Sequence, residues 1–177
     1  MIIVGENLRS LIVQEKICEE QCFDNSCISL SLGPEVIWLT PNDNYKILNY
    51  GENIPKSCIM RENINNKGLV IPPHKAVIAS SFESINIPIG YFGLLQTKGS
   101  LARMLVSLHC SDGQIDPGYS GKITFEIVNA SDFSIRINKK QPVGNLYIFK
   151  ASTDVTQPYR GRYFNATGPT IFKTEDE

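Results

Sequence analysis

A basic segment, Lys98-Gly99-Ser100-Leu101-Ala102-Arg103, contains residue types that bind phosphate. Glycine lets backbone N–H groups approach an anion, while Lys98 and Arg103 supply positive charge and Ser100 supplies a hydroxyl. The same pattern has an ordinary alternative, because basic loops are common on solvated surfaces. We therefore treat the segment as a candidate phosphate-binding loop.

A carboxylate interrupts the apolar stretch Ile123-Thr124-Phe125-Glu126-Ile127-Val128. Strand alternation places Glu126 on the face of Thr124 and Val128, opposite Phe125. One interpretation is an outward, solvated carboxylate. The other is a partly buried carboxylate with a raised pKa, which is suited to moving protons. Nearby, Asp116 precedes Pro117-Gly118, and an aspartate in such a turn usually caps backbone N–H groups.

The elements that must position these residues are short strands. Apolar spacing predicts a helix over Leu8 to Ile17, and Ser100 to Leu105 is the one internal segment that fits a helical turn. The stretch Asn42 to Lys67 is polar and predicts irregular structure. Strand signals, separated by Pro and Gly turns, cover residues 26–32, 35–39, 69–71, 75–80, 90–97, 122–129, 134–138 and 144–149. Many short strands without alternating helices predict a mainly β fold that is closed or sandwiched and antiparallel.

Length and composition exclude several classes of protein. The chain has 177 residues, of which 42% are hydrophobic and 20% charged, which is enough for a single domain with a real core. Its formal net charge of -1 argues against binding polymeric nucleic acid through positive charge. No stretch is long and apolar enough to predict a membrane span. The start, Met1 to Asn7, lacks the pattern of a signal peptide, so we expect a cytoplasmic protein.

The five cysteines are an odd number, so at least one has no partner within the chain. Reduced thiols in a cytoplasm are the simplest account. The first three are spaced too irregularly for a typical metal site, and no Cys-x-x-Cys pair follows them. We expect small, mostly buried side chains. The residues are Cys18, Cys22, Cys27, Cys58 and Cys110.

The motifs Gly-Ser-Leu-Ala-Arg and Ile-Asp-Pro-Gly-Tyr-Ser-Gly-Lys-Ile-Thr-Phe-Glu-Ile-x-Asn resemble the dCTP deaminase branch of the dCTP deaminase/dUTPase superfamily. Asn25 to Gly33, Gly68 to Pro88 and Pro142 to Leu146 extend the resemblance. Gln157-Pro158-Tyr159 and Arg162-Tyr163 resemble the segment that closes over the nucleotide. The resemblance implies one dUTPase-like domain over residues 1–177, a distorted β-barrel or jelly roll with a short N-terminal helix. It also implies a mobile C-terminal lid at 155–177.

The family resemblance implies hydrolytic deamination of dCTP to dUTP and ammonia without zinc, in a homotrimer with active sites between subunits. His74 and His109 are the only histidines, and no His-x-Glu motif with a later Pro-Cys-x-x-Cys provides a zinc deaminase site. Magnesium would bridge the phosphates of the nucleotide, with no protein side chain as a ligand.

The resemblance also implies a role for each matching residue. Glu126 would be the general acid/base, and Arg103, which could come from a neighbouring subunit, would polarise or position the same network. Asp116 would accept a hydrogen bond from the sugar 3′-hydroxyl, and Tyr119 would exclude a 2′-hydroxyl. The remaining substrate-binding residues would be Lys98, Gly99, Ser100, Leu101 and Ala102 around the phosphates, Thr124 and Phe125 beside the base, and Tyr159 and Arg162 from the lid.

Three positions depart from the family pattern. Gly99 stands where a catalytic-network serine is usual, Asp112 where alanine is usual, and Ala166 where a glutamine commonly binds phosphate. These departures keep three alternatives open. They are a dUTP diphosphatase that uses Asp116 to activate water, a bifunctional deaminase and diphosphatase, and a catalytically silent nucleotide binder. Glu126 favours deamination, because dUTPases resembling this chain carry an apolar residue there.

Overall fold

The computed structural model describes residues 1–172 and 174. The predicted acidic tail, Glu175 to Glu177, lies outside the described residues, as does Lys173 of the predicted lid. The strands are β1 (Ile2–Ile3), β2 (Phe23–Asp24), β3 (Cys27–Leu39), β4 (Ile59–Asn63), β5 (Leu69–Ile71), β6 (Ala76–Ser81), β7 (Ile85–Asn86), β8 (Tyr91–Thr97), β9 (Val106–Ser107), β10 (Gln114–Ile115), β11 (Ser120–Gly121), β12 (Thr124–Asn129), β13 (Ile135–Ile137) and β14 (Pro142–Lys150). The helices are α1 (Gly5–Glu15) and α2 (Gly99–Ala102), with 3₁₀ turns η1 (Glu20–Cys22) and η2 (Lys56–Cys58).

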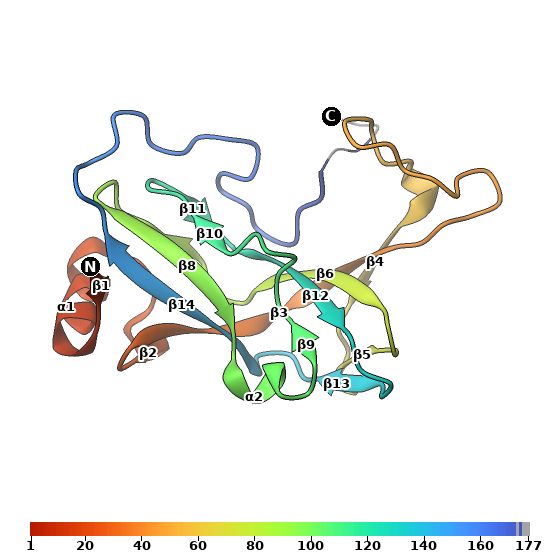
Figure 1. Ribbon diagram of the computed structural model, residues 1–177, viewed down its shortest axis with the longest axis horizontal. Coiled ribbons are helices and arrows are strands. Elements are labelled where there is room, and N and C mark those ends of the chain that lie inside the picture. Colours follow the sequence, from red (N-terminus) through yellow and green to blue (C-terminus); the bar gives the residue numbers. More distant parts are fainter. Residues whose placement is uncertain (173, 175–177) are drawn as a thin grey trace.

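Most strands belong to one curled sheet with the order β10-β8-β14-β3-β6-β12-β9 (Figure 1). The strand pairs in this sheet are antiparallel, and two short pairs, β11–β7 and β13–β5, lie outside it. The predicted mainly β fold with a short N-terminal helix is confirmed. No helix among the described residues combines the length and the apolar character needed to cross a membrane.

Strand β3 is shared by both halves of the sheet, and the sequence pattern had predicted two strands there. Residues 28–31 pair with β14, and after a register shift between Leu32 and Val36 the strand continues along β6 and β4. The shift occurs at Gly33, where a Cβ atom would lie 2.8 Å from the carbonyl oxygen of Ser80. The Gly-Pro pair therefore forms a bulge within one strand instead of ending it.

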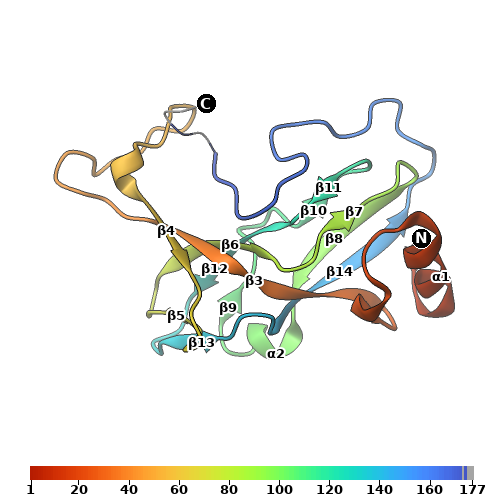
Figure 2. The ribbon, with the colours of Figure 1, turned by 180° about the vertical axis from the view of Figure 1, so that it is seen from behind.

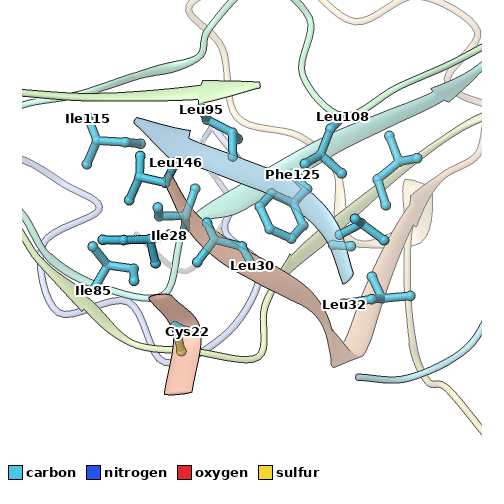
Figure 3. Close-up of a cluster of buried hydrophobic side chains, with 14 of the residues drawn as sticks. Cys22, Ile28, Leu30, Leu32, Ile85, Leu95, Leu108, Ile115, Phe125 and Leu146 are labelled. Carbon is cyan, nitrogen blue, oxygen red and sulfur yellow. The ribbon is translucent and has the colours of Figure 1, made fainter. Parts of the chain in front are cut away.

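The main core is a cluster of buried apolar side chains, most of them from the strands of the curled sheet (Figure 3). Phe125, Leu30 and Leu146 are fully buried there, and helix α1 covers one end through Leu8 and Ile12. The stretch Asn42 to Lys67, expected to be irregular, does contain a long loop, but it also contains β4, which extends the second half of β3. The second half of β3, the connecting residues 40–58 and β4 together form an arm that projects beyond the main core (Figures 1 and 2).

Candidate active site

A cavity of about 420 Å³ opens beside β10 and β12. Its walls come from β6, β10, β12, the turn between β10 and β11, and the C-terminal strap, which we define as residues 155–172. The strap crosses the open side of the curled sheet in both ribbon views (Figures 1 and 2). The lining residues are Ile78, Asp112, Gln114, Ile115, Asp116, Tyr119, Ile123, Thr124, Glu126, Tyr159, Tyr163, Thr170, Ile171 and Phe172.

Glu126 faces this cavity from the middle of β12. The strand alternates as predicted, with Thr124 and Glu126 half-buried and Phe125 fully buried on the opposite face. Glu126 pairs with Ile78 of β6, which also lines the cavity. Its Oε2 atom is buried and has no hydrogen-bond partner among the described residues. Such an unsatisfied carboxyl oxygen is a candidate contact for a substrate or for water.

The pKa of Glu126 is raised above its ordinary value, chiefly because burial penalises the charged carboxylate. The backbone N–H of Cys110 opposes this shift by stabilising the anion, and the negative charge of Asp112 adds to it. A carboxyl group with a raised pKa in a cavity takes up a proton more readily than an ordinary carboxylate, as a general acid/base must. The predicted partly buried carboxylate is therefore present.

The turn after β10 places Asp116 and Tyr119 in the cavity wall. The backbone N–H of Tyr119 donates to the carbonyl of Asp116 at 3.1 Å, closing the turn around Gly118, whose φ is +86°. The Tyr119 hydroxyl donates to the Lys122 carbonyl at 2.6 Å, which fixes the ring. Burial, with a smaller effect of Tyr159, raises the pKa of Tyr119 to about 12. Tyr119 therefore stays neutral, and its fixed ring lines the cavity.

The strap is docked on the same strands. The backbone N–H of Asn165 in the strap donates to the carbonyl of Ser120 in β11 at 2.7 Å. The backbone N–H of Lys122, which follows β11, donates to the carbonyl of Ala166 in the strap at 2.8 Å. Gly121 has a φ of +130°, and a Cβ there would lie 2.6 Å from the backbone nitrogen of Ala166. Only glycine lets the strap cross so closely.

Several predicted site residues lie outside this cavity. The segment from Lys98 to Arg103 forms helix α2 and its flanks at the opposite side of the sheet from the strap (Figures 1 and 2). The ring of Phe125 belongs to the core and does not face the cavity (Figure 3). Arg162 lies on the strap, where its guanidinium donates to the carbonyl of Phe172 at 2.7 Å. Of the predicted residues, the structure brings together Asp116, Tyr119, Thr124, Glu126 and Tyr159.

The cavity also contains residues that the motif did not identify as part of a site. Ile78 could have been found only from the register of β6 against β12. Thr170 and Phe172 come from the far end of the chain, and no local pattern links them to Glu126. Asp112 is one of the three positions that depart from the family pattern, and it lines the same cavity.

The cavity wall is acidic. Within the described part of the chain its lining includes Asp112, Asp116 and Glu126 but no lysine, arginine or histidine. Across residues 1–172 and Thr174, no group of three acidic, histidine or cysteine side chains could hold a metal ion. This wall can therefore transfer protons, whereas a triphosphate needs cations that it does not provide.

Comparisons with known proteins identify the family. The family described as dCTP deaminase-like matches residues 2–151, and the match ends before the strap. A dCTP deaminase, dUMP-forming, from Clavibacter michiganensis is 29% identical over 141 residues, covering 77% of this chain and 70% of the relative. One with the same name from Methanospirillum hungatei is 27% identical over 148 residues, covering 81% and 78%.

A solved structure shows the same fold. The crystal structure of 2′-deoxycytidine 5′-triphosphate deaminase from Agrobacterium tumefaciens superposes with a TM-score of 0.62 at 16% identity. The superposition covers 83% of this chain and 47% of that one, so this chain spans about half of the solved protein. The fold and the family match agree, and the chain belongs to the dCTP deaminase-like family.

Proposed function

We propose that the chain deaminates dCTP by hydrolysis and releases dUMP as the final product. The observation that carries the deamination step is Glu126, a half-buried carboxyl group with a raised pKa and an unsatisfied oxygen in the cavity. The motif alone favoured dUTP as product and left a bifunctional enzyme as an alternative. The name shared by the relatives, dUMP-forming, favours that alternative.

Glu126 would act on the water that attacks C4 of the cytosine ring. It takes a proton from this water and delivers protons to the ring nitrogen and to the departing amine, so that dCTP and water give dUTP and ammonia. Thr124 lies two residues earlier on the same face and would contact the base. A second water would then attack the phosphate chain with Asp116 as its base, releasing dUMP and pyrophosphate. Asp116 would also bind the sugar 3′-hydroxyl, beside the Tyr119 wall.

The phosphates would be bound by residues from a neighbouring copy in a homotrimer. The acidic wall of one copy needs cations, and Lys98 and Arg103 of helix α2 would supply them together with Ser100 and the backbone around Gly99. Beside α2, Met104 and Leu105 expose 49% and 62% of their surface. Covering these apolar side chains with a second copy supports the same arrangement. Leu101 and Ala102 complete the loop, and Arg162 would reach the phosphates from the strap.

Magnesium would be part of the substrate. The described side chains form no cluster that would fit a resident magnesium ion, and the ion would enter bound to the triphosphate. The protein would act in the cytoplasm, as the signal-peptide analysis and the odd number of cysteines predict.

Product analysis by ion-exchange chromatography tests the function. The purified protein is incubated with Mg²⁺ and dCTP, and separately with Mg²⁺ and dUTP. Formation of dUMP from dCTP supports the proposal, whereas accumulation of dUTP would restrict the chemistry to deamination. Conversion of dUTP alone would transfer the chemistry to Asp116, and binding without conversion would indicate a silent binder. Either of the last two results overturns the proposal.

A further inference from the structure

The arm formed by β3 and β4 contacts the strap at a second, smaller hydrophobic cluster. We call residues 50–58 of the arm the seat. Ile54 and Cys58 of the seat are buried with Ile37 of β3 and Ile171 of the strap. A backbone bridge also joins Ile54 to Thr174. The seat therefore fixes the strap near its end with the same apolar packing that builds a small core.

The cluster is continuous with the wall of the active-site cavity. Ile171 belongs to the cluster and also lines the cavity. Ile78 packs against the cluster, lines the cavity and pairs with Glu126 across the sheet. Any shift of the strap at the seat thus changes the shape of the cavity next to Glu126.

An aromatic pair extends the seat toward solvent. The rings of Tyr50 and Phe172 are stacked, with centroids 5.4 Å apart and planes at 28°. Tyr50 is 97% exposed even with Phe172 beside it, so its side chain makes no contribution to the main core. Phe172 lines the cavity. Tyr50 therefore contacts the cavity wall from outside.

Thr170 connects this part of the strap to the strand that carries Glu126. The hydroxyls of Thr170 and Thr124 lie 2.8 Å apart, and the backbone N–H of Thr170 donates to the Thr124 hydroxyl at 3.1 Å. The three consecutive residues Thr170 to Phe172 thus bridge from β12, through the cluster, to Tyr50.

We propose that the seat positions the strap as the substrate-binding wall opposite β12, and that Tyr50 is a positioning residue for nucleotide binding. Tyr50 would not contact the nucleotide. It would raise the fraction of molecules in which Thr170 to Phe172 are docked before substrate arrives, which lowers KM without changing the chemical step. The inference rests on the proposed function only for the identity of the nucleotide.

Three variants separate this role from a general effect on the loop. Tyr50→Ala removes the stacked ring, Tyr50→Phe keeps it, and Ile47→Ala removes an apolar side chain that is 79% exposed on the same loop. Two readouts are measured on the full chain. One is the rate of trypsin cleavage after Arg160 and Arg162 without nucleotide, followed by mass spectrometry. The other is KM and kcat for dCTP with Mg²⁺.

For Tyr50→Ala we expect cleavage to become about threefold to tenfold faster, because proteolysis follows the population of undocked strap and an aromatic pair stabilises by about this factor. KM should rise by a similar factor, with kcat within about twofold. Tyr50→Phe and Ile47→Ala should match the wild type in both readouts. Phe172→Ala should show no additive effect in the Tyr50→Ala background.

The proposal is overturned if Tyr50→Ala changes neither readout, if Ile47→Ala has the same effect, or if faster cleavage leaves KM unchanged. If the wild type neither binds nor converts dCTP, the proposed function has failed separately. The trypsin rates then still decide whether the seat docks the strap.

Discussion

The cavity wall and helix α2 differ in what they offer a nucleotide. The wall combines the half-buried Glu126 with Asp112 and Asp116, and the described lining contains no cation. The segment around α2 has Lys98 and Arg103 on a short turn of helix but no carboxylate. One region can move protons and the other can neutralise phosphate, and they lie on different sides of the chain (Figure 1).

The difference indicates why one copy of the chain would be incomplete. A carboxyl group keeps a raised pKa only when cations are kept at a distance, because a nearby guanidinium would stabilise the anion. A triphosphate has the opposite requirement. Both conditions would be satisfied if α2 of a second copy reached the phosphates and stayed away from the Glu126 carboxyl group.

The largest expected effect comes from removing the proton-transfer group of the acidic region. Glu126→Gln keeps the size and polarity of the side chain but cannot exchange a proton at neutral pH. We expect deamination of dCTP to fall by about 10²- to 10⁴-fold, the usual contribution of a general acid/base. Ammonia release and calorimetric binding of dCTP are the measurements. Retained turnover would show that Glu126 is not the base.

Mixing two inactive variants tests whether the two regions act across copies. The Glu126→Gln variant lacks the acid/base but keeps Arg103. The Arg103→Ala variant lacks this cation of α2 but keeps Glu126. If sites combine Glu126 of one copy with Arg103 of another, subunits remixed in equal amounts should recover about a quarter of the wild-type sites. Remixing each variant with itself is the control. No recovery in the mixed sample, once mixed assemblies are detected by mass spectrometry, would place both groups in one chain.

The smallest expected effect is a change in pH dependence. Asp112→Asn removes a negative charge that raises the pKa of Glu126, so the pKa of Glu126 should fall. If ionised Glu126 acts as the base, the acidic limb of the pH profile of kcat/KM moves to lower pH. At higher pH, where Glu126 is fully ionised, kcat/KM stays within about twofold of the wild-type value. Asp43→Asn, at an exposed position on the arm, is the matched control. An unchanged limb would mean that Asp112 has no electrostatic role.

Local patterns predicted the features that depend on neighbouring residues. Alternation placed Glu126 opposite Phe125, and spacing predicted α1 and the turn at α2. Local patterns gave the wrong prediction where contacts between segments far apart in the sequence determine the structure. The Gly33 bulge continues β3 because β6 passes close to it, and β4 forms in a polar stretch because β3 provides its partner.

The candidate site was also predictable only where its residues lie close together in the sequence. Asp116, Tyr119, Thr124 and Glu126 lie within one continuous motif, so the sequence could group them. The contact of Ile54 with Ile171 joins segments that are far apart in the sequence and carries no local signal. Packing of this kind follows from the complete fold and from no single window of the chain.

The shared strand β3 has a consequence for synthesis of the protein. Its first half, around Ile28, pairs with Leu146 and neighbouring residues of β14, near the end of the chain. While a ribosome is still producing the middle of the chain, this edge of β3 has no strand beside it, because β2 pairs with Ile28 at the opposite edge. An apolar strand edge therefore stays uncovered until almost the whole chain has emerged, and this period is when a nascent chain most needs a chaperone.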